Sequence, residues 1–174
     1  MWYQSKIKYG ALGDDMKRIT RTEVFLHEAI TYAEVEAQLY TILEGRVKDF
    51  DYSISDNAKF SAVYDTFAGG DFYKVKVVEE IGDKKRTLHH LVAASDVADA
   101  QKRVEAYLKN SLIGFTIDGA TKSAILGVWN PASEDWQNDF KQRMEDLREA
   151  GHESVGINQL EIDFKKRASE PAAA

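Results

Sequence analysis

The start of the chain alternates between polar and apolar side chains with a period of two. In the stretch 2–9, Ile7 falls on one side, and Lys6 and Lys8 fall on the other. This period, together with several aromatic residues, predicts a half-buried β-strand. A turn rich in glycine and aspartate follows, and the β-branched stretch 17–26 predicts a second strand. The two strands together predict an antiparallel hairpin.

The period then changes to that of a helix over 31–43. Thr31 is placed to cap this helix, and Glu34 stands three residues later, as a capping box requires. Apolar residues recur after it at steps of three and four. Two shorter alternating runs, 50–54 and 60–67, predict the next pair of strands.

The second half of the chain repeats this order of elements. Its strands are predicted over 72–81, 86–93, 113–118 and 122–129, and its helix over 95–108 with Ser95 as the cap. In the first of these strands Val75 and Val77 face one way, whereas Lys74 and Lys76 face the other. The exposed side of this strand is therefore predicted to be basic, like that of the first strand.

The two halves are interpreted as ββαββ pseudo-repeats, 1–68 and 71–130. Their helices share an acidic residue followed by Ala and Gln, at 36–38 and at 99–101. The alternative is that any two such units look alike, because capping and periodicity demand the same residue types. Under either interpretation we expect an α+β fold, in which an antiparallel sheet carries the helices on one face.

A third helix is predicted over 133–150, with Ser133 as its cap. An apolar stripe runs along one face of this helix: Trp136, Phe140, Met144 and Leu147. We interpret the stripe as a contact with the sheet, and the alternative is a helix that binds a partner. The stretch 158–164 predicts a short edge strand, and 165–174 is predicted to be a disordered tail. The sequence therefore predicts a single domain over 1–164.

Composition narrows the class of protein. The chain has 174 residues, of which 44% are hydrophobic, and this is enough for a real core. Cysteine is absent, which excludes disulfides and thiolate metal sites. No apolar run approaches the length of a membrane span, and the first residues lack the apolar region of a signal peptide. We therefore expect a cytoplasmic protein that does not interact with membranes.

Charge is distributed unevenly along the chain. The net charge of −6 opposes indiscriminate binding of nucleic acid. However, residues 1–26 hold five Lys or Arg against three acids, whereas residues 27–68 hold three against eight. Because a ligand in a groove responds to the local field, the two regions predict different kinds of partner.

No catalytic set is recognisable in the sequence. The histidines are His27, His89, His90 and His152, and their spacing is not that of metal ligands. The glycine pairs lack the Lys-Ser/Thr of a phosphate loop, and no nucleophile elbow is present. Two carboxylates from separate elements could still converge on one bond, which leaves an enzyme as an alternative. We expect a protein with no catalytic residues, no metal and no cofactor.

Basic residues gather in the four strands that open the two halves. They are Lys6, Lys8, Arg18, Arg21, Lys74, Lys76 and Arg86. Aromatic residues lie near the same strand ends: Trp2, Tyr3, Tyr9, Phe72 and Tyr73. If the two hairpins lie side by side, cations can follow phosphates and rings, Tyr73 among them, can stack on bases, as in proteins that bind single-stranded nucleic acid. The alternative is that these lysines only solubilise an open sheet face and protect its edges.

Two short motifs carry a resemblance to a known family. They are MWY at 1–3 and the helix start TYAEVEA at 31–37. They resemble an uncharacterised family, a domain of unknown function found in Bacteroidetes bacteria and their phages, whose members begin Met-Trp-aromatic and open a helix with Thr-aromatic-x-Glu-Ala-Glu. Val35 stands where that pattern has Ala. The resemblance implies a phage or mobile-element setting and supplies no functional residues.

The sequence supports two functional hypotheses. The first is a non-catalytic phage or mobile-element accessory protein that binds single-stranded nucleic acid through a basic sheet face. The alternative is a phage-encoded interaction protein that binds a host defence protein or a small signalling ligand through the acidic stretch 27–68 and the third helix. Under both, the protein would work in the host cytoplasm, and a homodimer formed by edge strands or by the third helix is compatible with each.

Overall fold

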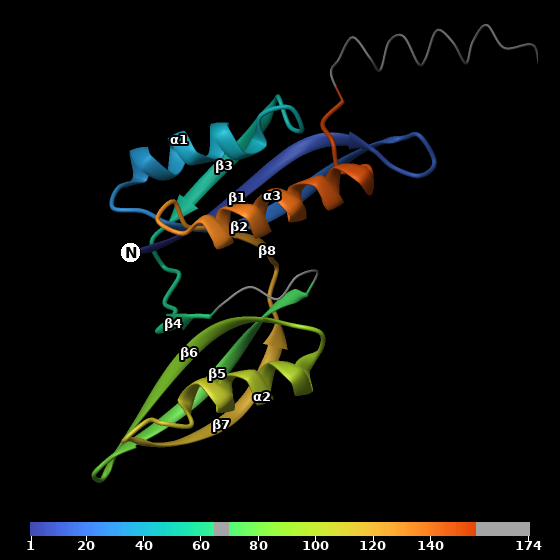
Figure 1. Cartoon of the computed structure of the whole chain (residues 1–174). Helices are drawn as coiled ribbons and strands as arrows, with labels where there is room; N and C mark the ends of the chain where they lie inside the picture. Colours follow the sequence, from blue (N-terminus) through green and yellow to red (C-terminus); the bar gives the residue numbers. More distant parts are fainter. Residues whose placement is uncertain (65–69, 156–174) are drawn as a thin grey trace, which may run out of the picture.

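Two four-stranded sheets make up the structure, one covered on one face by two helices and the other by one (Figure 1). The computed structural model describes residues 1–64 and 70–155. The strands are β1 (Trp2–Leu12), β2 (Arg18–Glu28), β3 (Phe50–Ser55), β4 (Ala62–Val63), β5 (Asp71–Ile81), β6 (Lys84–Ala94), β7 (Gly114–Lys122) and β8 (Ile125–Trp129). The helices are α1 (Tyr32–Leu43), α2 (Val97–Leu108) and α3 (Glu134–Glu149).

The first sheet, called sheet A, has the strand order β3-β1-β2-β8. β1 and β2 form a long antiparallel hairpin, from Trp2 opposite Glu28 to Leu12 opposite Arg18. β3 pairs antiparallel with β1, and β8 pairs parallel with β2. Both α1 and α3 pack on the same face of this sheet (Figure 1).

The second sheet, called sheet B, has the strand order β4-β6-β5-β7. β5 and β6 form its antiparallel hairpin, which turns at Gly82 with a φ of 61°. A positive φ costs glycine no strain, and this suits a tight hairpin turn. β7 pairs antiparallel with β5, and β4 pairs parallel with β6. α2 covers one face of sheet B (Figure 1).

The last strand of each half completes the sheet of the other half. β4 leaves the first half to pair with β6, and β8 leaves the second half to pair with β2. The prediction of one antiparallel sheet is therefore wrong, because there are two sheets and each contains a parallel pair. The α+β class with a C-terminal helix is confirmed. The order β3-β1-β2-β8 corresponds strand for strand to β7-β5-β6-β4, which favours the pseudo-repeats, although these remain a prediction.

The main core lies between sheet A and its two helices. Ile7 and Phe25 of the sheet meet Leu39 of α1 and Phe140 of α3, and all four are at most 1% exposed. Met144 of α3 belongs to the same cluster. The predicted apolar stripe of the third helix thus packs against the sheet, and burying side chains of this size is the main stabilising term for such a contact. The alternative of a partner-binding stripe on this helix is wrong.

The uncovered faces of the two sheets meet at one end in an apolar junction. Its buried members are Leu26, Phe72, Leu91, Ala93, Ile125, Val128 and Trp136. Alternation along β2 puts Leu26 on the face opposite the buried Phe25, away from α1 and α3. The junction therefore joins sheet A to sheet B through the sides that carry no helix, together with Trp136 from the start of α3.

Side-chain caps begin all three helices. Thr31 and Ser133 each accept a hydrogen bond from the backbone N–H three residues later, as predicted. In α2 the cap is Asp96 rather than Ser95, because Asp96 accepts from the N–H of Asp99 at 2.8 Å. Ser95 instead donates its own N–H to the Asp99 carboxylate at 3.0 Å. The cap is thus one residue later than predicted, and the Asp99 carboxylate binds the residue that precedes it.

Some predictions fall at or beyond the limits of the described residues. The edge strand over 158–164 and the tail over 165–174 both lie outside them. The strand predicted over 60–67 is described only as β4, because 65–69 also lie outside. In the described part of the chain, no helix has the length and apolar character needed to span a bilayer.

Candidate nucleic-acid interface

The face of sheet A that its helices leave open carries the first predicted cations. Because neighbouring residues in a strand point to opposite sides, Lys6 and Lys8 are exposed and Ile7 between them is buried. We call this side the outward face of sheet A. Lys8 lies opposite Thr22 of β2 on one side and Asp51 of β3 on the other.

The two arginines of β2 lie on opposite faces of the sheet. Arg18 is exposed, and a Cβ added at Gly10 would lie 3.0 Å from its Nε. The glycine therefore lets the Arg18 side chain lie close to β1 on the outward face. Arg21 lies opposite Tyr9, on the side covered by the helices. Arg21 thus does not join the exposed cations, and the sequence prediction that groups it with them does not match this placement.

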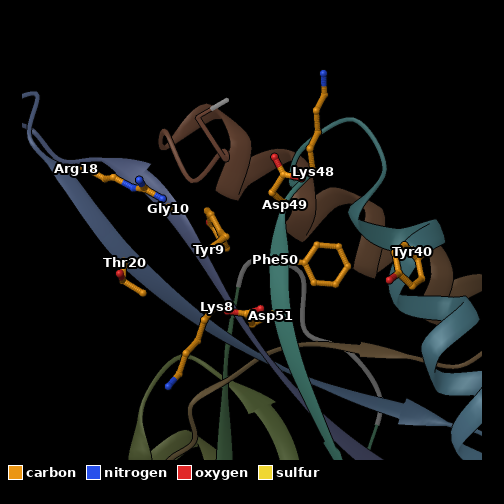
Figure 2. A pocket seen from close by; sticks show the side chains of 10 residues that line it. All are labelled: Lys8, Tyr9, Gly10, Arg18, Thr20, Tyr40, Lys48, Asp49, Phe50 and Asp51. Carbon is orange, nitrogen blue, oxygen red and sulfur yellow. The ribbon is translucent and has the colours of Figure 1, made fainter. Parts of the chain in front are cut away.

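Lys8, Arg18 and Lys48 line one open hollow of about 590 Å³ at the start of β3 (Figure 2). The other residues that line it are Tyr9, Gly10, Thr20, Tyr40, Asp49, Phe50 and Asp51. Lys8 and Lys48 point in opposite directions in Figure 2, so the cations are spread along the surface rather than gathered around one point. Within residues 1–64 and 70–155, none of the three cations takes part in an ion pair.

An exposed aromatic ring lines the same hollow from the helix side of β3. Tyr40 of α1 is 58% exposed, and its ring centroid lies 5.4 Å from that of Phe50. Asp49 and Asp51 also line the hollow, so its formal charge is +1 rather than +3. Tyr40 was not among the predicted site residues. The helical period could have indicated its exposure. Leu39 of α1 is fully buried against the sheet, and the next residue along a helix points in a different direction.

A buried ion pair fixes the loop that carries Lys48. Arg46 donates to both carboxylate oxygens of Glu23, at 2.8 and 2.7 Å, and the two side chains are 4% and 2% exposed. The Tyr9 hydroxyl donates to the same carboxylate at 2.6 Å. Burial is the largest cause that raises the pKa of Tyr9, and the hydrogen bond to Glu23 is the next. The hydroxyl therefore keeps its proton. The Ser154 hydroxyl accepts from the Lys48 backbone N–H at 2.9 Å, and this exposed hydrogen bond also stabilises the loop.

Sheet B carries a second group of cations on its own uncovered side. Lys74 and Lys76 are exposed on β5 and line a hollow of about 360 Å³. Its other lining residues are His89, Asp118, Gly119, Ala120 and Thr121. Lys76 forms an ion pair with Asp118 at 2.6 Å. Burial lowers the pKa of His89, and the two lysines lower it further.

The remaining predicted residues of sheet B lie on the helix side. Tyr73 is 6% exposed and packs under α2 in the cluster that contains Val75. Arg86 lies on the same side of β6 as the buried Val92, an even number of residues away. Other rings predicted to flank the site are also buried: Tyr3, Tyr9 and Phe72. For these four rings the predicted aromatic flank is wrong, since they form the cores, whereas Trp2 is partly buried against the apolar junction.

The structure brings the predicted cations together in two groups rather than one. Lys6, Lys8 and Arg18 lie on sheet A, whereas Lys74 and Lys76 lie on sheet B. The expectation that the two opening hairpins lie side by side in one sheet is therefore wrong. The hairpins instead belong to separate sheets that meet at the apolar junction.

A hydrogen-bonded chain of Ser5, His27 and Gln38 lies inside the molecule. Ser5 Oγ is 2.7 Å from His27 Nε2, and His27 Nδ1 is 3.1 Å from Gln38 Oε1. Because this amide oxygen can only accept, Nδ1 carries the proton and Nε2 accepts from the serine hydroxyl. The order resembles a nucleophile, a base and an orienting group. However, Ser5 and His27 are 0% exposed, and burial lowers the pKa of His27 to about 4, so the chain serves packing.

The four histidines lie in separate environments. His27 is in the core of sheet A, and His89 is on the uncovered side of sheet B. His90 bonds to the Tyr64 hydroxyl at 2.7 Å, and His152 lies 3.9 Å from Glu23. Among the residues that the structure describes, no three His, Asp or Glu side chains gather so as to hold a metal ion.

The architecture defines an α+β protein whose two sheets each borrow a strand from the other half of the chain. The family model DUF4494, a domain of unknown function, matches residues 1–132, and the chain belongs to this family. The match takes in all eight described strands and ends just before α3. Neither a curated protein nor a solved structure matches the chain. The resemblance to an uncharacterised domain family is thus confirmed.

Proposed function

We propose that the protein is a non-catalytic accessory protein that binds single-stranded nucleic acid through the outward face of sheet A and the adjoining edge at β3. The observation that carries the proposal is the hollow in which Lys8, Arg18 and Lys48 stand without ion-pair partners among the described residues, next to the exposed ring of Tyr40. Cations that follow phosphates and rings that stack on bases are the two elements of single-strand recognition. The phage or mobile-element setting that the sequence resemblance implies is part of the same proposal.

The spacing of the cations favours a chain of phosphates over a single ion. The three cations come from β1, β2 and the loop before β3, and they do not converge on one point (Figure 2). A polyanion that passes through the hollow would meet them one after another. Because the whole chain carries a net charge of −6, such binding would be local and would not spread over the surface.

The exposed ring favours a single strand over a duplex. In a duplex the bases are stacked on each other, whereas in a single strand a base face is free to stack on a tyrosine. Removing such a contact costs about 1–3 kcal/mol of binding free energy per base. We therefore expect Tyr40→Ala to weaken binding of a single-stranded oligonucleotide and to leave duplex binding unchanged.

The salt dependence of binding tests the role of the cations. Three phosphate contacts on a single strand give a slope of about −2 in a plot of log K against log salt. The variant Lys8→Gln/Arg18→Gln should bring this slope to about −0.7, because one contact remains. Fluorescence anisotropy of a labelled thymidine oligomer, titrated with KCl, measures it.

A matched control removes two cations elsewhere. Lys84 at the β5–β6 turn and Lys102 on α2 are exposed, and the variant Lys84→Gln/Lys102→Gln changes the net charge equally. It should keep the slope of the unmodified protein. An equal loss of slope in both variants would mean that only net charge matters, and absence of binding at low salt would end the proposal.

The other hypothesis loses one of the two features on which it depended, the third helix. An interaction protein that uses the third helix needs an exposed apolar stripe, but Trp136, Phe140 and Met144 are each at most 8% exposed. We therefore propose nucleic-acid binding rather than docking of a host protein on this helix.

A further inference from the structure

We infer that the chain has two separate phosphate-binding sites, one on the uncovered side of each sheet, and is therefore bivalent for single-stranded nucleic acid. The inference rests on the proposed function and extends it from sheet A to sheet B. It is carried by the register of the two sheets, by the separation of the two hollows, and by the chemistry of the hollow on sheet B.

The lysine pairs occupy equivalent positions in the two sheets. Lys6 on β1 lies between Val24 of β2 and Ser53 of the edge strand β3. Lys74 on β5 lies between Leu91 of β6 and a residue of the edge strand β7. That residue is Thr121, so a hydroxyl stands beside the first lysine in both sheets. The same kind of donor set for a phosphate thus occurs twice.

The second lysine of each pair continues this correspondence. Lys8 lies opposite Thr22 and Asp51, and Lys76 lies opposite His89, with Asp118 within bonding distance. Each sheet therefore presents two lysines on its inner strand, with hydroxyl and carboxylate groups on the edge strand beside them. In sheet A the carboxylate of Asp51 lies directly opposite the second lysine, whereas in sheet B Gly119 holds that register and Asp118, next to it at the bulge, reaches Lys76.

The two sites lie on different sheets, which meet at the apolar junction. Val24 and Leu91, the cross-strand neighbours of Lys6 and Lys74, belong to or pack against this junction. The hollow with Lys8 and the hollow with Lys74 share no lining residue. A short oligonucleotide bound in one hollow therefore leaves the other free.

The hollow on sheet B has the donors that a phosphate needs. Lys74 has no ion-pair partner in the described residues, and Thr121 and His89 supply a hydroxyl and an imidazole. Lys76 is held by Asp118, but both side chains are about half exposed, at 47% and 53%. Exposed ion pairs of this kind contribute about 0–1 kcal/mol, so a phosphate can replace the carboxylate.

His89 gives the sheet B site a pH signature that sheet A lacks. The charged groups around it are Lys74 and Lys76 of β5 and Asp118 of β7, while β4 contributes none in its described residues. The two lysines disfavour the imidazolium, whereas a bound phosphate would favour it. Binding at this site should therefore strengthen as the pH falls. The sheet A hollow has no histidine among its lining residues and should not respond in this way.

Bivalency has a measurable consequence for oligonucleotide length. Two linked binding events raise the apparent affinity by about 10²–10⁴-fold when one strand can reach both sites. A thymidine oligomer of about five nucleotides is near the lower limit for one site. It should bind with two copies per chain, whereas a much longer oligomer should bind with one copy and a higher affinity.

Native mass spectrometry of the full chain with the short thymidine oligomer, at low salt, tests the inference. We expect two bound copies for the unmodified protein and one copy each for Lys6→Glu/Lys8→Glu and Lys74→Glu/Lys76→Glu. His89→Gln should weaken the second copy and remove its strengthening at lower pH. Milder Lys→Gln pairs, with folding checked by circular dichroism, replace any charge reversal that fails to fold.

The outcomes separate this inference from the proposed function. One bound copy that either charge-reversed variant abolishes would indicate a single continuous site and overturn bivalency alone. One bound copy that only the Lys6/Lys8 variant abolishes would overturn the sheet B site and leave the proposed function intact. No bound copy for the unmodified protein would overturn both.

Discussion

The buried Glu23–Arg46 pair gives the most direct test of how this fold is held together. The perturbation is Arg46→Met, which keeps an unbranched side chain of similar length and removes the charge. Arg46 donates to Glu23 at 2.8 and 2.7 Å, and it also donates to the His152 carbonyl at 2.7 Å. Without Arg46, the Glu23 carboxylate keeps only Tyr9 as a hydrogen-bond donor among the described residues.

The magnitude follows from what remains after the substitution. The Glu23 side chain is 2% exposed, so water cannot replace the lost donors. Breaking a buried ion pair from one side costs about 3–5 kcal/mol, because it leaves an uncompensated charge. Since the total stability of a domain is about 5–15 kcal/mol, Arg46→Met should remove a large fraction of it.

Removing both charges should cost much less than removing one. Replacing a buried pair by apolar side chains of similar volume is often neutral or stabilising, because both desolvation penalties disappear. We therefore expect Glu23→Leu/Arg46→Met to recover most of the stability that Arg46→Met loses. The Tyr9 hydroxyl then loses its acceptor, which costs about 1–3 kcal/mol and keeps the double variant below the unmodified protein.

Urea unfolding of the unmodified protein, both single variants and the double variant measures the coupling. The transitions are followed by circular dichroism, with the same slope m in each variant as the check on comparability. A loss below about 1 kcal/mol in Arg46→Met would show that the pair is not the source of stability. Additive losses in the double variant would refute the argument from an uncompensated charge.

Three further predictions concern single positions. His27 has a folded pKa of about 4 against 6.5 in the unfolded chain, so its contribution is fully present above pH 6.5 and is lost as the pH falls towards 4. That loss is about 3 kcal/mol, and His27→Gln should flatten this part of a stability profile measured by urea unfolding between pH 4 and 7. At Gly127, an added Cβ would lie 2.8 Å from the Phe140 ring, so Gly127→Ala should cost about 1–3 kcal/mol in thermal unfolding, while Gly114→Ala, which meets nothing within 4 Å, should not destabilise. Ser133→Ala removes the cap bond of α3 and should cost about 1 kcal/mol, and an unchanged melting temperature would contradict this.

Local patterns in the sequence were sufficient to predict the elements and several of their details. Alternation placed Lys6 and Lys8 outward and Ile7 inward, as observed. The caps at Thr31 and Ser133 were predicted because a cap depends only on residues within one turn. The apolar stripe of α3 was predicted for the same reason, since a helix fixes which residues share a face.

Part of the candidate site was predicted wrongly although the sequence held the signal. Tyr73 adjoins Lys74 in one strand, so the two side chains must point to opposite faces. Arg18 and Arg21 are three residues apart, and an odd separation along a strand also places two side chains on opposite faces. Applying the strand period to each residue, rather than to each strand as a whole, would have removed Tyr73 and Arg21 from the exposed surface.

The tertiary structure alone decided which strands share a sheet. β1 and β2 belong to one sheet and β5 and β6 to the other, and this divides the predicted basic surface into two. The tertiary structure also decided that Lys48 and Tyr40 line the same hollow as Lys8 and Arg18. The physical reason is that helix faces and caps depend on near neighbours along the chain. Strand pairing depends instead on hydrogen bonds between distant segments, and a strand's own residues do not specify its partner.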